Sequence, residues 1–391
     1  MLVLSTYFTN EIKTMTTIVD GQAGITFPDS SAQGTAGYTG FRNRIINGAM
    51  VVDQRNAGAA ITPSSTQYTV DRWNFANNVA SKITLQQNKG AVTPPVGFAN
   101  YLGATTSTAY SVGVNDYLTL YQAIEGYNTV DFAWGTGTAK TVTLSFWVYS
   151  SIAGVFGGSL QGITSTYRSY PFLYNINAAN TWQFISIVVP GDTGAPAGGW
   201  NTTNGYGCIV WLGLGVGTTY SGSAGSWASA NYLSAVGATS MVATQGANFY
   251  VTGLQLEVGV IATPFERRLY NVELAMCQRY YYQQSANTPI VGQTAFFSIP
   301  FNLPVTMRTS PSVGYPYTDA TFTSSGSVPS GQWGIQYVGV SAASKTGTVA
   351  FGLATPTANS GMIYTTGATW SQTTNWLQST NLAAVTFSAE L

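Results

Sequence analysis

Residues 141–149 read TVTLSFWVY, and this stretch sets the fold class of the chain. Apolar and polar residues alternate along it, and β-branched and aromatic side chains dominate, which is typical of a strand with one buried face. Similar runs, separated by clusters of Gly, Pro, Asn and Asp, recur at 81–87, 116–124, 181–189, 206–216 and 248–257. No helical period interrupts them, so residues 41–263 are expected to form one all-β domain, a jelly-roll-like β-sandwich.

One helix signal follows this domain. Asn271 suits a helix cap, Glu273 falls in the first turn, and apolar residues follow at spacings of three and four. We therefore expect a helical connector at 264–284, with the helix near 271–282. Residues 285–391 return to β-type patterns and are expected to form a smaller C-terminal β domain.

The chain is poor in charge. Of its 391 residues, 14 are Lys or Arg and 14 are Asp or Glu, together 7%, against about 25% in an ordinary soluble protein. This balance leaves no field that would attract nucleic acid or an anionic membrane. The sequence has no His, which removes the commonest general base and the commonest metal ligand and disfavours most classes of enzyme.

Acidic residues of the predicted sandwich are the candidates for catalysis: Asp53, Asp71, Asp116, Glu125, Asp131, Asp192 and Glu257. A glycosidase needs two facing carboxylates, and no spacing brings two of these together. The sequence therefore favours a protein without catalysis, cofactor or metal, although a calcium ion in a sandwich loop stays open. The charges at the two ends of the domain are instead expected to form a salt-bridged seam.

Targeting signals are weak. Residues 1–15 lack the basic region of a signal peptide, and the apolar run at 208–216 has about half the length of a membrane helix. Cys208 and Cys277 show no zinc or redox spacing, so buried free thiols are favoured over one disulfide. These features predict a soluble protein made in a reducing cytoplasm.

Aromatic residues among small polar ones are the candidates for ligand binding. A ring stacks on a sugar while neighbouring amides bind its hydroxyls. In the sandwich these are Trp200 and Trp227. In the C-terminal domain they are Tyr315, Tyr317, Trp333, Tyr337, Trp370 and Trp376. Filling of subunit contacts explains them equally well. The tryptophans within strand runs are expected in the core: Trp73, Trp134, Trp147, Trp182 and Trp211.

Four segments carry a family resemblance. Residues 24–29 read GITFPD and are followed by Gln33, and 43–50 read NRIINGAM, followed by Gln54-Arg55 and Asp71-Arg72-Trp73. Residues 141–148 and 252–268 (TGLQLEVGVIATPFERR) form the third segment, and 273–281 (ELAMCQRYY) the fourth. Together they resemble tail-fibre and receptor-binding proteins of tailed bacteriophages that contain a carbohydrate-binding-module-like β-sandwich. Ser30 departs from the family's short fibre segment, which has Gly, and beyond residue 282 only 303–308 (LPVTMR) is loosely similar.

This resemblance implies a virion protein, a homotrimer assembled in the host cytoplasm, that attaches the particle to a host surface polysaccharide. Residues 1–40 would attach it to other tail or baseplate proteins, with Ile18, Val19, Ile25 and Phe27 as contacts. Residues 285–391 would be distal and face the receptor. The last 111 residues carry four charges, Arg308, Asp319, Lys345 and Glu390, which favours burial against identical neighbours.

Three functions stay open on the sequence. The first is a receptor-binding fibre without catalysis, which inserts in no membrane and binds no nucleic acid. The second is a structural virion component, such as a capsid-decorating fibre or a baseplate protein. The third, a polysaccharide depolymerase, ranks below both. The sequence leaves open which host glycan is bound, which end of the fibre meets it, and what residues 1–14 do.

Overall fold

The computed structural model describes the predicted sandwich almost completely. Residues 41–164, 166–195 and 199–283 are described with their side chains, as are 303–312 and 386–391, and the backbone is described in the other strands named below. The chain divides into two compact units, Met1–Leu269 together with Leu391, and Tyr270–Glu390.

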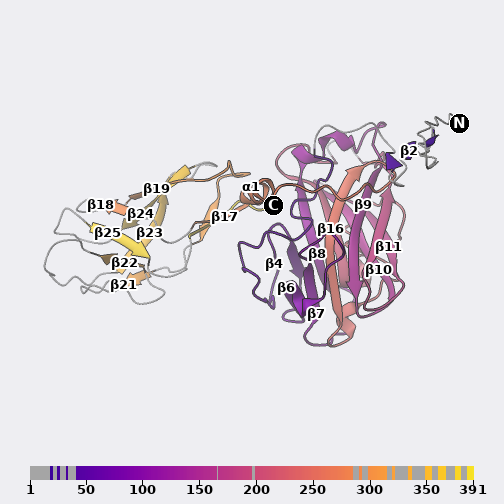
Figure 1. The fold of residues 1–391 in the computed structure, drawn as a ribbon, viewed down its shortest axis with the longest axis horizontal. Coiled ribbons are helices and arrows are strands. Elements are labelled where there is room, and N and C mark those ends of the chain that lie inside the picture. The colour runs from indigo at the N-terminus through magenta and orange to yellow at the C-terminus, as the bar shows by residue number, and fades with distance from the viewer. Residues whose placement is uncertain are drawn as a thin grey trace, which may run out of the picture. The chain divides into compact units, whose positions relative to one another are not determined.

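The first sheet of the sandwich has six antiparallel strands (Figure 1). In spatial order they are β11 (Tyr167–Ile176), β10 (Gly154–Ile163), β13 (Tyr206–Val216), β8 (Tyr117–Glu125), β5 (Asn74–Asn77) and β4 (Gln67–Tyr68). The order is far from the sequence order, so strands from distant parts of the chain become neighbours.

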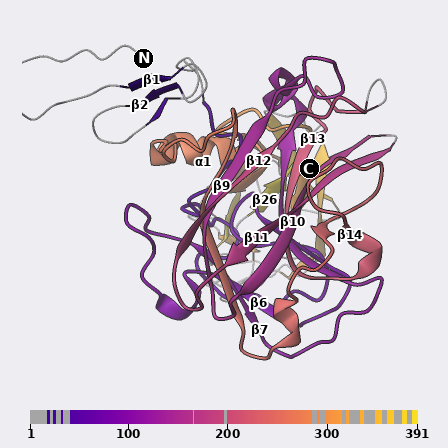
Figure 2. The same ribbon diagram turned by 90° about the vertical axis from the view of Figure 1, so that its right-hand side faces the viewer.

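The second sheet has five antiparallel strands and lies against the first. In spatial order they are β12 (Gln183–Val189), β9 (Val142–Ser150), β16 (Asn248–Val258), β7 (Leu102–Thr106) and β6 (Ile83–Gln87). Figure 2 views the sandwich from the side on which the edge strands β11 and β12 lie. The predicted all-β, jelly-roll-like sandwich is confirmed.

The core lies between the two sheets and follows the alternation of the strands. On β9 every second residue, including Leu144, Phe146 and Val148, is buried in it, and Val210 and Leu212 of β13 face them from the other sheet. Burial of such side chains contributes about 1.5–3 kcal/mol each, which explains why the alternating runs fold as they do. Trp73, Trp134 and Trp211 are buried as expected. The same prediction was wrong for Trp147 and Trp182, because both are half-buried at the outer face of the five-stranded sheet.

Short elements connect the strands. A parallel pair, β14 (Ser221–Gly222) and β15 (Ser234–Ala235), lies in the loop after β13. Single 3-10 turns occur at Lys89–Ala91, Gly126–Asn128, Val130–Phe132, Thr218–Tyr220 and Met241–Ala243. Cys208 is a buried free thiol, as is Cys277 in the second unit, so the preference for free thiols is confirmed.

Before the sandwich, three short strands form a small sheet: β1 (Ile18–Asp20), β2 (Gly24–Thr26) and β3 (Ala32–Gln33). The backbone thus pairs at three of the four predicted attachment residues, Ile18, Val19 and Ile25. Their side chains, and Phe27 altogether, lie outside the described residues.

The second unit begins with α1 (Tyr270–Gln278), the one α-helix among the described residues, inside the predicted connector. Three small antiparallel sheets follow. The first holds β17 (Tyr281–Gln284), β26 (Val385–Ser388) and β20 (Ser312–Gly314). The second holds β18 (Ile290–Gly292), β25 (Asn375–Ser379) and β22 (Trp333–Gln336). The third holds β19 (Ser298–Asn302), β24 (Ser360–Thr366), β23 (Thr348–Ala354) and β21 (Asp319–Thr321).

Candidate functional site

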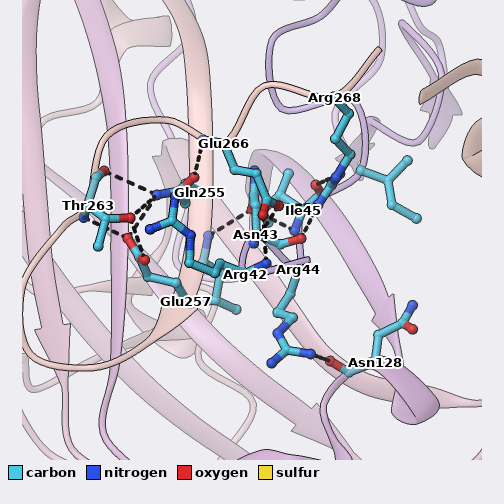
Figure 3. Close-up of polar contacts among 12 residues, drawn as sticks. Arg42, Asn43, Arg44, Ile45, Asn128, Gln255, Glu257, Thr263, Glu266 and Arg268 are labelled. Carbon is cyan, nitrogen blue, oxygen red and sulfur yellow. Dashed lines mark hydrogen bonds and ion pairs between the residues drawn. The ribbon is translucent and has the colours of Figure 1, made fainter. Parts of the chain in front are cut away.

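A polar seam joins the two ends of the sandwich domain (Figure 3). Glu266 accepts hydrogen bonds from the backbone N–H groups of Arg42 and Asn43 at 2.9 and 3.1 Å, and Arg268 donates to the carbonyl oxygens of Asn43 and Ile45. The entering segment therefore lies along the exit segment, as the charge pattern predicted. Backbone acceptors, rather than carboxylates, take most of the arginine donors.

Two side chains complete this seam on the outer face of β16. Glu257 accepts from the backbone N–H and the hydroxyl of Thr263 at 2.8 and 2.7 Å, and Gln255 donates to Glu257 and accepts from the backbone N–H of Glu266. Asn43 is 3% exposed and makes three bonds, accepting from Ile45 and Leu256 and donating to Leu254. These groups satisfy one another, so the seam is built to hold the domain closed rather than to receive a ligand.

The predicted loop tryptophans of the sandwich form an aromatic cluster. Trp200 is 9% exposed and packs edge-on against Trp134 and Trp227, with ring centroids 4.7 and 5.4 Å apart. Its indole N–H donates to Asp192 at 3.0 Å, while that of Trp227 donates to the carbonyl of Pro190. Both N–H groups are thus used inside the protein, and a role of Trp200 and Trp227 in glycan binding stays a prediction.

Asp192 anchors this cluster through a buried ion pair with Arg168. Burial by itself raises the pKa of Asp192, but hydrogen bonds from Arg168, Trp200 and the Gly194 N–H outweigh it and hold the pKa below its usual value. The carboxylate therefore stays ionised and paired, which suits a structural role.

The predicted receptor-facing residues of the C-terminal domain stay predictions. Trp333 begins β22 and Trp376 lies in β25, where the two strands pair, but the structure does not describe their side chains. Tyr315, Tyr317, Tyr337 and Trp370 lie outside the described residues.

A row of side chains crosses the outer face of the six-stranded sheet. The register places Tyr68 opposite Asn74, Asn74 opposite Tyr121, and Tyr121 opposite Trp211. Ser159 and Pro171 continue the row on the last two strands. Three aromatic rings and one amide thus come from four different strands, β4, β5, β8 and β13, and share one line on the sheet.

Hydrogen bonds fix the rings of this aromatic row. The rings of Tyr121 and Trp211 lie 4.4 Å apart, and Asn74 Nδ2 donates to the Tyr121 hydroxyl at 3.0 Å. Trp211 Nε1 donates to Gln161 Oε1 at 3.1 Å, and Gln161 Nε2 donates to Asn231 Oδ1 at 2.9 Å. Side chains held in this way cost little entropy when a ligand binds them.

One polar atom of the row has no partner. Asn74 is 5% exposed, and its Oδ1 is buried and accepts no hydrogen bond from any described residue. Burying an unpaired acceptor costs about 1–3 kcal/mol, so this atom is unfavourable unless a neighbouring side chain moves aside and an outside donor, such as a sugar hydroxyl, reaches it.

The loop after β13 packs onto this face, where its buried Leu233 joins Trp211 and Ile209 in one apolar cluster. Close approach is possible because β10 and β13 carry glycines there: a Cβ at Gly157 or at Gly213 would lie 2.6 or 2.8 Å from Ser234 Oγ. The Ser234 hydroxyl is itself buried without a partner among the described residues. Half-buried side chains border the remaining face: Tyr117, Tyr206, Val216 and Tyr220.

Sequence reasoning missed this row. Trp211 was predicted to lie in the core, Tyr121 was only part of the predicted strand at 116–124, and Asn74 lies in a four-residue strand without a clear pattern. The available signal was the alternation itself: in β8 and β13, Tyr121 and Trp211 fall on the positions opposite to Leu120 and Leu212. The sequence did not predict which strands lie side by side or in which register they pair.

Neither a metal cluster nor a membrane helix is found in the described part of the chain. No group of three or more His, Cys, Asp or Glu side chains is placed to hold an ion there. None of the helices described is long and apolar enough to cross a membrane.

No protein-family model and no curated protein matches the sequence. Solved structures do. The enzymatically active domain of tailspike protein 4 of bacteriophage CBA120 is 13% identical over 56% of this chain and 21% of its own length, with a TM-score of 0.31. A protein of Bacteroides thetaiotaomicron provisionally called sugar binding is 12% identical over 56% of this chain and its full length (100%), with a TM-score of 0.32.

A family 11 carbohydrate-binding module of Clostridium thermocellum, in complex with a mixed-linked β-1,3-1,4 tetrasaccharide, is 11% identical over 51% of this chain and 97% of its own. Its TM-score is 0.26. Likenesses at this level assign neither a ligand nor an activity to the chain.

Proposed function

We propose that the sandwich binds a glycan on the outer face of its six-stranded sheet, and that the chain is a receptor-binding fibre protein of a tailed bacteriophage. The observation that carries the binding proposal is the aromatic row with the unpartnered Asn74 Oδ1 between Tyr68 and Tyr121. The sequence resemblance supports the virion assignment and the attachment to a host surface.

The chemistry of the row suits a sugar. A pyranose ring has an apolar face that stacks on Tyr or Trp and hydroxyls at its edge that need acceptors. The half-buried Tyr121 supplies the ring, backed by the buried Trp211 at 4.4 Å, and Asn74 Oδ1 supplies the acceptor. No member of the row carries a formal charge, and the Arg55 guanidinium lies over the Tyr68 ring, 4.5 Å from its centroid. A neutral or weakly charged glycan therefore fits, and binding would depend little on salt.

The proposal assigns binding without bond cleavage. Glycoside hydrolysis needs two carboxyl groups facing one sugar. In the sandwich, Asp192 is paired with Arg168, and Glu257 is hydrogen-bonded to Thr263 and Gln255. These pairings support a binding role, and a depolymerase remains the weaker alternative.

The C-terminal domain is the second candidate for the receptor contact. Its aromatic residues, among few charges, have the composition of a glycan-binding surface. One site alone would bind weakly, but a homotrimer would present three copies, and several fibres would raise the avidity by orders of magnitude. The sandwich face and the C-terminal domain would then act together.

Titration of the purified full chain with oligosaccharides released from the host's surface polysaccharide tests the sandwich site. Tyr121→Ala and Asn74→Ala should weaken binding, and Tyr149→Ala, on the opposite outer face, serves as the matched control. Equal affinity of all three variants and the wild type would reject the site. The same mixtures, assayed for new reducing ends, should show none, and their appearance would favour the depolymerase.

A further inference from the structure

The edge strand β12 has the features of an interface. It pairs with β9 on one side only, through seven consecutive residue pairs without a register shift. Every second residue of an edge strand points its N–H and C=O groups away from the sheet, where they template pairing with another chain.

β12 lacks the devices that block such pairing in monomeric proteins. These devices are charged residues, Pro and bulges on the edge strand. The sequence of β12 is QFISIVV, with no charge and no Pro, and its ladder is regular. Ile185 and Ile187 pack on the core, while Phe184 and Val188 on the outer face are 48% and 44% exposed.

The neighbouring edge strand differs from β12. β11, the edge strand of the other sheet, contacts β12, but the loop at 225–228 hydrogen-bonds to its outer edge at Ser169 and Pro171. On the side of the sandwich seen in Figure 2, the outer edge of β12 is thus the one that no described residue pairs. Exposed apolar residues on an unpaired edge strand, here Phe184 and Val188, mark a contact with another protein.

We propose that β12 pairs antiparallel with β12 of a second copy of this chain, about a two-fold axis at Ser186. An antiparallel pair centred there places Ser186 opposite its own equivalent and Phe184 opposite Val188 of the second copy. An aromatic side chain opposite a β-branched one is a favourable cross-strand pair, and no like charges meet. The strand is thus complementary to itself, as a two-fold interface requires, and it carries no charge that would select a foreign strand.

This contact is independent of the proposed glycan site, which lies on the other sheet. It is also compatible with a trimer held by the C-terminal domain. Two trimers would then be joined through their β12 strands. Whether the chain forms dimers or such paired trimers, the assembly would contain an even number of chains.

The mass of the full chain in solution at micromolar concentration tests this pairing. The wild type should contain an even number of chains. Ser186→Lys places two lysines opposite each other across the axis and should halve the mass, because like charges directly opposite destabilise a pair. Ser65→Lys, at another exposed serine, adds the same charge away from the edge and should leave the mass unchanged.

Cross-linking gives a second readout that does not depend on the lysine variant. Ser186→Cys should form a covalent pair on mild oxidation, and Ser65→Cys should not, while Cys208 and Cys277 are buried and contribute little background. A monomer or a trimer in the wild type, an unchanged mass of Ser186→Lys, or equal cross-linking of the two cysteine variants would overturn the proposal. Loss of attachment in Ser186→Lys without a change in mass would point to a foreign strand instead and would also overturn it.

Discussion

The two outer faces of the sandwich are built on the same alternation of residues but differ in how their polar groups are satisfied. On the five-stranded sheet, Gln255, Glu257 and Thr263 bond one another, and burial together with the neighbouring Tyr101 and Tyr149 raises the pKa of Tyr250 to about 12. On the six-stranded sheet, the aromatic row leaves Asn74 Oδ1 without a partner.

This difference separates a face that stabilises the fold from the face that we propose receives a ligand. A closed network of hydrogen bonds contributes to stability, and losing one member leaves the others buried and unpaired. A buried acceptor that is already unpaired destabilises the fold, and this cost is removed only when a donor binds it. The comparison of the faces can therefore be tested with matched substitutions.

The largest effect is expected from two buried asparagines. Asn43→Ala removes three hydrogen bonds of the seam and leaves their backbone partners buried, so it should lower the free energy of unfolding by about 3 kcal/mol or more. Asn74→Ala removes one bond to a half-buried tyrosine and relieves an unpaired acceptor, and should cost less than about 1 kcal/mol. Urea unfolding of both variants measures this, and equal losses would contradict the distinction between the faces.

The second effect concerns affinity. Tyr121→Ala should weaken binding of host oligosaccharides about tenfold, since an aromatic stacking contact contributes about 0.5–1.5 kcal/mol beyond the area it buries. Its unfolding free energy should change little compared with that of Asn43→Ala. Isothermal titration gives the affinity, and an unchanged value would remove Tyr121 from the site.

The third effect is a dependence of stability on pH that arises at Asp192. The uncharged aromatic row should show no such dependence. The pKa of Asp192 is lower in the folded chain than its ordinary value of 3.8, so its ion pair with Arg168 contributes fully above that pH. This contribution is lost as the pH falls through the folded-state pKa. As the pH is lowered from about 5 to about 3, the urea midpoint of the wild type should thus decrease. Over the same range the difference in urea midpoint between the wild type and Asp192→Asn should become smaller. A gap that stays constant over this range would contradict the assignment.

The smallest effect is expected on the opposite face. Trp147→Ala removes a half-buried ring of the five-stranded sheet that lies opposite Phe184 and Thr252. Because this ring lies on the other sheet from the aromatic row, glycan affinity should change by less than about twofold. A loss comparable to that of Tyr121→Ala would place the glycan on the wrong sheet.

The sequence predicted the parts of this molecule that follow from local periodicity. Alternating runs such as 141–149 located the strands, and the spacings near Asn271 located the helix. The helix spans Tyr270–Gln278 instead of 271–282, so Asn271 lies inside it and is not its cap. The charges at the two ends of the domain also predicted that the entering and exit segments of the sandwich lie together. The aromatic row was not predictable, because it depends on long-range register: Tyr68, Asn74, Tyr121 and Trp211 become neighbours only through the pairing of four strands.

Burial of loop aromatics was hard to predict for a related reason. Trp200 is surrounded by Gly, Asn and Thr in the sequence, yet Asp192 and Trp134 enclose it. Local composition indicates a loop, but it does not indicate what the loop packs against. Likewise, Trp147 was expected in the core because it lies within a strand run, whereas the alternation of that strand places it on the outer face.

The most direct test of the central claim is adsorption of the full chain to host cells with one face altered at a time. The double variant Asn74→Ala/Tyr121→Ala should lose most of its adsorption, whereas Tyr149→Ala/Trp147→Ala should adsorb like the wild type. Retained adsorption of the first pair, with or without loss in the second, would contradict binding by the six-stranded face. That result would direct the search to residues 285–391, whereas a wild type that does not adsorb would favour a structural role in the virion.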